Sequence, residues 1–338
     1  MSIIMTGGGT GGHLAIIRAV KEQLEGQSLI YVGSTKGQDR AWFAEDDAFD
    51  AHYFFQTEGV VNQRFLGKIK SLFALAKATY TSLKLLKKHQ AEVVFSVGGF
   101  SSAPMAFASK LRGIPLVIHE QNAQIGTLNS LLKPYATLFL SSYLEESPLK
   151  AYPIQSHFFK EARLRQEVKT LLFLGGSQGA RAINQLALSL APELQKRGIT
   201  ILHQAGEAHL QEVKEAYKAL GIEAEVFGFT SELVGLMKRA DFAIARSGAS
   251  TLWELSAMAL PTLYIPYPYA VGDHQYYNAR FLEEQGLAWI MRESELDATK
   301  VLALLEEDLE GVSQGLMQSI QEGGSEAIAQ RLTQFLDK

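Results

Sequence analysis

The sequence predicts an α/β protein made of two doubly wound, Rossmann-like domains that face each other across a cleft. Short apolar runs alternate with segments long enough for helices, which is typical of a parallel sheet with helices on both faces. An apolar strand and a glycine-rich turn open the chain at Ser2–Gly12, and the same arrangement returns at Thr170–Ala180, about halfway along the 338 residues. At this length, two domains of roughly 150 residues each are expected.

The expected strands form two sets, separated by a junction near Tyr152-Pro153. The first set comprises Ser2–Thr6, Ser28–Val32, His52–Phe55, Val93–Val97, Leu116–His119 and Thr137–Leu140. The second set comprises Thr170–Leu174, Ile199–His203, Ala224–Phe227, Phe242–Ala245, Thr262–Ile265 and Ala288–Met291. We therefore assign residues 1–152 to a first domain and 153–324 to a second. In open parallel sheets ligands bind beyond the carboxyl ends of the strands, so the segments after these strands are the candidate site.

Composition excludes several classes of function. The chain is 47% hydrophobic and 20% charged, as in ordinary globular proteins, and its net charge of −4 gives no reason to expect a nucleic-acid partner. The absence of cysteine removes disulfides, thiolate metal sites and a thiol nucleophile. The N-terminus lacks the basic and apolar segments of a signal peptide, and no apolar run approaches the ~18 residues of a membrane span. We expect a protein of the cytosol or of the inner face of a membrane.

The first glycine loop, Gly7–Gly12, lies between the strand Ser2–Thr6 and a helix expected over Leu14–Leu24. Backbone N–H groups and the positive end of the helix dipole make such a loop an anion site. The same dipole disfavours imidazolium at His13, which favours a neutral side chain able to accept a proton. The alternative for His13 is a histidine that only binds backbone groups at the helix end.

Gly7, Gly9 and Gly12 also match the dinucleotide-binding fingerprint. A nicotinamide enzyme needs an acidic residue at the end of the second strand to bind the ribose, but residues 31–34 supply none. The next acidic residue, Asp39, lies well into the following segment. We interpret the match as accidental.

Two further polar segments follow strands of the first domain. Gly98-Gly99-Phe100 opens a turn rich in glycine and hydroxyl groups, and His119–Asn122 places four polar side chains directly after an apolar strand. Four such residues would make a poor core, so we expect them at the mouth of the site.

The second domain carries a second candidate site. Ser247–Thr251 is expected to form a helix N-terminus with N–H groups and hydroxyls aimed at an anion, and Glu254, one turn later, suits a pair of ribose hydroxyls. The alternative is an ordinary capping box in which Ser250 or Thr251 pairs with a nearby Glu. The loop around Asp273–Asn278 adds side chains suited to sugar hydroxyls.

Together these features predict a nucleotide-sugar site. The sequence contains no Asp-X-Asp, so we expect no metal and no cofactor. Helix dipoles and backbone N–H groups are then expected to stabilise the departing nucleotide diphosphate.

Residues 64–88 depart from the neutral pattern, with seven basic residues, no acidic one and many interleaved apolar residues. One interpretation is the solvated basic face of an amphipathic helix. The other is a surface that lies on anionic lipid, which Lys68-Ile69-Lys70 beside Leu72-Phe73 favours.

Five motifs resemble, in order and in approximate spacing, those of the MurG-type N-acetylglucosaminyltransferases, which form lipid II for bacterial peptidoglycan. They are Gly8–His13, Gly98–Phe100, His119–Asn122, Gly175–Ala180 and Arg246–Ala249. The resemblance covers essentially the whole chain and implies the glycosyltransferase B-type architecture. It also implies inverting transfer of N-acetylglucosamine from its UDP donor to the 4-hydroxyl of the muramyl sugar of lipid I, the undecaprenyl-diphospho-muramyl-peptide.

The resemblance also implies roles for particular residues. His13 corresponds to the favoured general base, with Glu120 as a second candidate, and the last helix, within residues 325–338, is expected to pack back on the first domain. Glu254 would hold the ribose. Substrate-binding positions carried over from the family are Thr10, Gly11, Gly12, Asn122, Ser177, Thr230, Arg246, Ala249, Ser250, Thr251, Leu252, Trp253, Glu254, His274 and Gln275, with Gly98, Gly99 and Phe100 as the acceptor loop.

Three positions depart from the family pattern. Gln155 stands where an arginine near the donor is usual, Phe100 replaces a frequent tyrosine, and His274 replaces the first of two tandem glutamines of some members. Each change weakens one contact without removing the expected activity.

Because the acceptor is a polyprenyl lipid, the resemblance favours a peripheral protein on the cytoplasmic face of the cell membrane. The residues expected at an anionic membrane surface are Phe65, Lys68, Ile69, Lys70, Leu72, Phe73 and Lys77. The alternatives are a related two-domain UDP-sugar transferase with another lipid or small-molecule acceptor, a UDP-sugar-binding regulator without turnover, and, from another class, a nicotinamide oxidoreductase.

Overall fold

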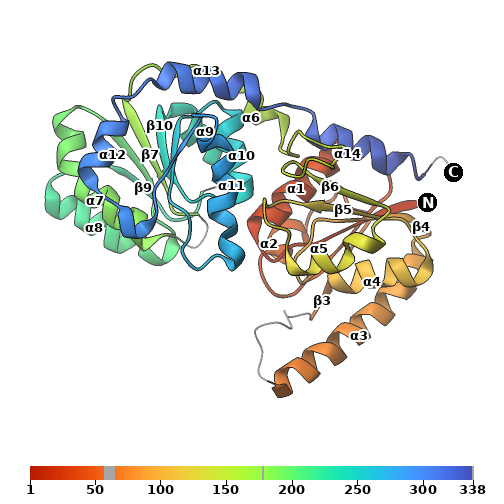
Figure 1. Ribbon diagram of the computed structural model, residues 1–338. Coiled ribbons are helices and arrows are strands. Elements are labelled where there is room, and N and C mark those ends of the chain that lie inside the picture. The colour runs from red at the N-terminus through yellow and green to blue at the C-terminus, as the bar shows by residue number, and fades with distance from the viewer. Residues whose placement is uncertain (57–64, 177–178, 231, 337–338) are drawn as a thin grey trace. The chain divides into compact units, whose positions relative to one another are not determined.

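The computed structural model describes residues 1–56, 65–176, 179–230 and 232–336, without the side chains of residues 65–70 (Figure 1). The chain forms two compact units. Unit 1 comprises Met1–Gln155 and Gly323–Lys338, and unit 2 comprises Ser156–Glu322. Each unit is a parallel α/β domain, so the predicted fold class is confirmed.

Unit 1 contains a six-stranded parallel sheet in the order β3-β2-β1-β4-β5-β6. Its strands are β1 (Ser2–Thr6), β2 (Leu29–Ser34), β3 (Ala51–Phe55), β4 (Ala91–Ser96), β5 (Leu116–Glu120) and β6 (Leu138–Ser141). Its helices are α1 (Gly11–Glu22), α2 (Asp39–Phe43), α3 (Phe65–Lys88), α4 (Ala103–Arg112), α5 (Thr127–Leu132), the 3₁₀ turn Lys133–Tyr135 and α14 (Gly324–Thr333). The six strands expected from the sequence are all present: β1 has the expected bounds, and the ends of the others differ by at most two residues.

Burial explains why the apolar runs became central strands. All five residues of β1 are buried, and Ile3, Ile4 and Met5 have no exposed surface. Parallel strands covered by helices on both faces need such continuous apolar sequence. The edge strand β3 is only half-buried along its length. The sheet order also places the carboxyl ends of β1, β4 and β5 next to one another.

Unit 2 repeats this plan, with its sheet in the order β12-β11-β10-β7-β8-β9. Its strands are β7 (Thr170–Leu174), β8 (Thr200–Gln204), β9 (Glu225–Phe227), β10 (Phe242–Ala245), β11 (Thr262–Tyr264) and β12 (Trp289–Ile290). Its α-helices are α6 (Ser156–Lys160), α7 (Arg181–Lys196), α8 (Leu210–Leu220), α9 (Leu233–Arg239), α10 (Ala249–Ala257), α11 (His274–Glu283), α12 (Ala298–Leu304) and α13 (Leu309–Ser319). Short 3₁₀ turns occupy Glu207–His209, Val271–Asp273 and Glu293–Glu295.

The last helix, α14, packs against α1 in unit 1 (Figure 1). Its start is held by the Oγ of Ser325, which donates to the carbonyl of Ile154 over 3.1 Å. Gly324 passes so close to Tyr152 that a Cβ at this position would lie 2.5 Å from the tyrosine carbonyl. The C-terminal helix is therefore anchored to residues 152–154, close to the end of the first segment of unit 1.

In the described part of the chain, no helix combines the length and the apolar character that crossing a membrane requires.

Candidate active site

The first glycine loop is clamped between two neighbouring loops of unit 1. Gly8 has φ of 155°, and a Cβ there would lie 2.5 Å from Oδ1 of Asp39. On the other side, a Cβ at Gly99 would lie 2.6 Å from the carbonyl oxygen of Gly8, so only glycine fits this approach. The ring of Phe100 lies against Gly9. The predicted acceptor loop, Gly98–Phe100, therefore packs directly on the first glycine loop.

Asp39, the first residue of α2, has a structural role that the sequence analysis did not predict. Its carboxylate is fully buried and accepts hydrogen bonds from Gly9 N (2.7 Å), Ser34 N (2.9 Å) and the Tyr31 hydroxyl (3.1 Å). Burial and the Asp39 carboxylate raise the pKa of Tyr31 far above its usual range, so the phenol remains a donor. Asp39 therefore holds the backbone of the first glycine loop.

His13, the third residue of α1, is brought together with two of the polar side chains predicted around it. Thr10 Oγ1 lies 2.9 Å from His13 Nδ1. The amide nitrogen of Gln121 lies 3.1 Å from His13 Nε2 and 3.3 Å from Nδ1. Thr10 is exposed and His13 is half-buried, so the imidazole remains within reach of a ligand. Gln121 lies in the motif expected at the mouth of the site, but no role was predicted for it individually.

Glu120 has a different environment from the one expected of a base. Its Oε1 accepts from Asn122 N (2.9 Å), and its Oε2 accepts from Gly126 N (3.0 Å) and Asn129 Nδ2 (2.9 Å). The residue is 2% exposed. These contacts make Glu120 the anchor of the β5–α5 loop, and they place Asn122 beside it at the end of β5.

His119 is completely buried behind the site. Burial, and secondly the charge of His13, lower the pKa of His119 to about 3, so it is neutral at physiological pH. Neither ring nitrogen has a hydrogen-bond partner among the described residues. Its ring meets Tyr152 edge-on at 5.6 Å between centroids.

The first loop of unit 2 follows β7 and leads into α7. Ser177 lies outside the described residues. Gly179 is pressed against β8, because a Cβ there would lie 2.5 Å from the Ala205 carbonyl oxygen. Asn184 donates to the same carbonyl over 3.2 Å and accepts from His203 Nε2 over 3.0 Å. This buried network, which the sequence did not indicate, fixes the helix that the loop precedes.

The N-terminus of α10 is the second predicted anion site. Its N-cap is Gly248, so Ser250 and Thr251 lie inside the first turn and the capping-box alternative is wrong. Ala249 and Ser250 are buried and Thr251 is half-buried. Backbone N–H groups in the first turn of a helix have no intrahelical acceptor, so a turn of this kind can bind an anion.

The next residues of α10 are two buried apolar side chains, which pack the helix in place, and the acid Glu254. Leu252 and Trp253 are buried, and the Trp253 ring stacks on Phe281 at 5.1 Å. Their side chains therefore serve packing. Glu254 is half-buried, and desolvation raises the pKa of its carboxyl to about 7.

Arg246, at the end of β10, braces the neighbouring loop. Its guanidinium donates to the carbonyls of Ile265 (3.0 Å) and Pro266 (3.2 Å) and forms an ion pair with Glu293. It also lies over the ring of Tyr267. The Arg246 guanidinium is therefore already bonded to protein groups of the neighbouring loop.

The first turn of α11 ties the same loops together. Gln275 Oε1 accepts from Tyr267 N over 2.9 Å, and Asn278 Nδ2 donates to the Ser247 carbonyl over 3.2 Å. His274 Nδ1 donates to the Val271 carbonyl over 3.0 Å, which leaves Nε2 as an acceptor. Thr230 is half-buried, and its Oγ1 accepts from Glu232 N over 2.9 Å.

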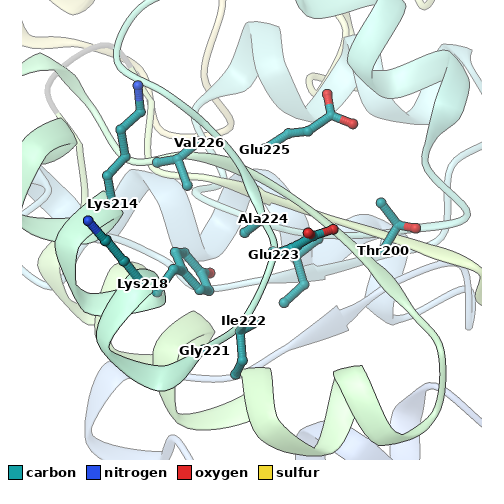
Figure 2. Close-up of a pocket in the computed structure, with 11 residues that line it drawn as sticks. Thr200, Lys214, Lys218, Gly221, Ile222, Glu223, Ala224, Glu225 and Val226 are labelled. Atoms are coloured by element: carbon teal, nitrogen blue, oxygen red, sulfur yellow. The ribbon is translucent and has the colours of Figure 1, made fainter.

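A separate hollow of ≈ 640 Å³ lies in unit 2 at the amino ends of β8 and β9 (Figure 2). Lys214 and Lys218 of α8 line one side, and Thr200, Glu223 and Glu225 line the other. The carboxyl ends of the strands carry the predicted loops, so this hollow is not the candidate site. In the described ranges, no group of three or more acidic, histidine or cysteine side chains is placed to hold a metal ion.

Helices α3 and α4 form an apolar surface on unit 1. Leu72 is 54% exposed and Phe73 is 76% exposed, and Lys77 is also exposed. A groove of ≈ 550 Å³ between the two helices has an almost wholly apolar lining, in which Leu75 and Leu83 face Phe107 and Leu111 across it. The side chains of Phe65, Lys68, Ile69 and Lys70 lie outside the described residues.

Comparison with known proteins identifies the family. Models of the N-terminal and C-terminal domains of glycosyltransferase family 28 match residues 3–141 and 170–332. The chain is 66% identical over 335 residues, 99% of each chain, to the UDP-N-acetylglucosamine–N-acetylmuramyl-(pentapeptide) pyrophosphoryl-undecaprenol N-acetylglucosamine transferase of Sulfurovum sp. (strain NBC37-1). It is 54% identical to the protein of the same name from Sulfurimonas denitrificans, over 94% of each chain.

The crystal structure of Acinetobacter baumannii MurG shares the fold, with a TM-score of 0.78 and 25% identity over 98% of this chain and 99% of that chain. The two domain models, the high identity to curated relatives and the full-length structural match agree with one another. The chain therefore belongs to glycosyltransferase family 28 and, within it, to the MurG transferases.

Proposed function

We propose that this enzyme transfers N-acetylglucosamine from UDP-N-acetylglucosamine to the muramyl sugar of lipid I and so forms lipid II. The observation that carries this proposal is the 66% identity, over 99% of both chains, to a transferase named for that reaction. Two features of the site support it. A half-buried histidine follows the first glycine loop in unit 1, and unit 2 contains a helix N-terminus of the kind that binds phosphate groups.

His13 is the general base of this proposal. It accepts the proton of the acceptor's 4-hydroxyl as that oxygen bonds to the anomeric carbon, while the bond from this carbon to the UDP oxygen breaks. Direct displacement of this kind inverts the anomeric configuration. The first turn of α1 favours the neutral imidazole that a base requires. Glu120 is the weaker candidate because both of its oxygens already accept hydrogen bonds from its own loop.

The donor is assigned to unit 2. In this proposal the N-terminal turn of α10 donates backbone N–H groups to the diphosphate and so stabilises the charge that develops on departing UDP. Glu254 accepts hydrogen bonds from the ribose hydroxyls. His274 Nε2 accepts a hydrogen bond from the UDP-sugar. Gln275 and Arg246 contribute indirectly, because their side chains hold the neighbouring loop in position.

The protein is proposed to work as a peripheral protein on the cytoplasmic face of the cell membrane. The acceptor's tail is a polyprenyl chain, and the α3–α4 surface combines exposed Leu72 and Phe73 with exposed Lys77. Apolar side chains beside cations suit an anionic lipid surface. No nucleic-acid partner and no cofactor form part of the proposal.

The decisive experiment measures product formation from UDP-N-acetylglucosamine and a lipid I analogue, together with calorimetry against UDP and NAD. Turnover with UDP binding supports the proposal. UDP binding without turnover indicates a regulator, and turnover only with another acceptor indicates a related transferase. Tight binding of NAD without binding of UDP would end the transferase assignment.

A further inference from the structure

The amide of Gln121 lies against the imidazole of His13, although the two residues are 108 positions apart in the chain. Its nitrogen is 3.1 Å from Nε2 and 3.3 Å from Nδ1, so it lies near the ring edge that both nitrogens share. Gln121 is 7% exposed. Gln121 directly follows β5, and in the sheet β4 separates β5 from β1, the strand that leads into the loop before His13.

The other end of the same amide is unused. Oε1 of Gln121 is buried and has no hydrogen-bond partner among the described residues. A buried carbonyl oxygen without a partner is unusual and needs an explanation. A carboxamide carries a donor group and an acceptor group of nearly the same shape, and rotation about its last bond exchanges them.

The charged groups of the elements around His13 are neutral or bonded elsewhere, and the Thr10 hydroxyl lies 2.9 Å from Nδ1 beside the amide. His119, behind the ring on β5, is neutral because burial lowers its pKa to about 3. The acids of the adjacent elements are bonded elsewhere, Asp39 of α2 to Gly9 N and Glu120 of β5 to its own loop.

The remaining charged groups near α1 are also engaged away from the imidazole. Arg18, on the same helix, lies over the Trp42 ring, and Glu22 binds Gln155. On α14, Glu326 accepts from the Ser325 hydroxyl and Arg331 donates to the Ala327 carbonyl.

We propose that Gln121 is a positioning residue that serves both protonation states of His13. With the imidazole neutral, the NH₂ end faces the lone pair on the ring, and the acceptor's hydroxyl takes its place there before the proton moves. When His13 has taken the acceptor's proton, the amide turns over and Oε1 faces the positive charge that both ring nitrogens share. The proton moves from the acceptor hydroxyl to His13, and the amide neither gains nor loses one. This inference rests on the proposed role of His13 as the base.

The test measures the titration of His13 directly, by NMR of selectively labelled histidine Cε1–H in the full-length protein. Gln121→Glu places a permanent acceptor charge at the same distance and is expected to raise the pKa of His13 by about one pH unit or more. Gln121→Met keeps the side-chain length without the amide and should not raise it. Gln23→Glu, at the exposed C-cap of the same helix and therefore at the end opposite His13, is the control for added charge and should leave the titration unchanged.

Kinetics supply the second readout. In Gln121→Glu the acidic limb of the kcat/KM profile should move upward together with the His13 titration. In Gln121→Met, kcat should fall about 10-fold while the affinity for UDP stays within twofold.

The outcomes separate the two claims. An unchanged His13 titration in Gln121→Glu overturns the role of Gln121, whatever the activity. A shifted titration with an unmoved kinetic limb, or full activity in His13→Ala, overturns His13 as the base and leaves the contact between the side chains intact.

Discussion

The carboxylate of Asp39 accepts a 2.7 Å hydrogen bond from the backbone N–H of Gly9, a residue 30 positions earlier in the chain. This bond directs one N–H of the first glycine loop into the protein and away from a ligand. A buried acid therefore holds the loop from inside the domain, and Thr10 and His13 follow the bonded glycine.

Replacing Asp39 by asparagine should misplace this loop. In the native protein three donors bond the Asp39 carboxylate. In the variant the asparagine NH₂ group faces one of these donors, and this mismatch lowers the unfolding free energy by about 1–3 kcal/mol. We expect kcat to fall at least ~10-fold with the affinity for UDP unchanged. Ser109→Ala removes another buried hydrogen bond of unit 1, to Ile114 at the far end of α4, and is the matched control. Equal kcat in the two variants would show that Asp39 contributes only to stability.

Removal of the proposed base should affect turnover and little else. His13→Ala is expected to lower kcat by ~10² or more, with UDP affinity within twofold, since the imidazole contacts the reacting hydroxyl in the proposed mechanism. Steady-state kinetics and calorimetry of the same preparation check this. A variant with normal kcat would transfer the role to another group.

Glu120→Gln distinguishes the two base candidates. The glutamine keeps one acceptor oxygen but faces Gly126 or Asn122 with an N–H, so thermal stability should decrease. Because the carboxylate is a structural anchor in this proposal, the acidic limb of the kcat/KM profile should remain where it is. A lost limb would identify Glu120 as the titrating base.

Glu254 makes the stability of unit 2 depend on pH. Its pKa is raised from about 4.5 to about 7 in the folded protein, so the folded state binds the proton more tightly than the unfolded state. Stability should therefore fall as pH rises from about 4.5 to 7 and level off above that value. Glu254→Gln should remove this dependence and, at pH 8, increase the unfolding free energy by about 1–3 kcal/mol. Urea unfolding of both proteins at pH 5 and pH 8 measures this. The same change in unfolding free energy between the two pH values in the native protein and in Glu254→Gln would contradict the prediction.

The same titration should appear in donor binding. An ionised Glu254 accepts from two ribose hydroxyls, whereas its protonated form must donate or lose one of these bonds. UDP affinity should therefore rise as pH increases through about 7, and Glu254→Gln should weaken binding about 10-fold at pH 8 and flatten the profile. Calorimetry across this range is the measurement. A flat profile in the native protein would place the ribose elsewhere.

Membrane binding should depend on the α3–α4 surface. Phe73→Ser combined with Lys77→Glu changes two exposed side chains and should reduce binding to anionic liposomes, most clearly at low salt. Lys214→Glu with Lys218→Glu changes exposed lysines of α8 in unit 2 and is the control. Equal losses in the two proteins would indicate a non-specific charge effect.

Local sequence was sufficient to predict most of the architecture. Continuous apolar runs such as Ser2–Thr6 and Thr170–Leu174 became buried central strands, because a strand covered on both faces has few other solutions. Glycine-rich turns after these strands marked the loops at the carboxyl ends of both sheets. The motif at Gly248–Glu254 likewise predicted a helix start and an acid one turn later.

Tertiary structure decided how the chemical groups pair. Gln121 reaches His13, and Asp39 reaches Gly9, only because the sheet order places β5 and β2 on either side of β1 and β4. The raised pKa of Glu254 likewise comes from desolvation by burial in the folded domain. The sequence by itself determined the two α/β domains, the order of the glycine loops and the family to which they belong. Which neutral amide faces the histidine, and which acid holds its loop, depend on long-range contacts that no local pattern encodes.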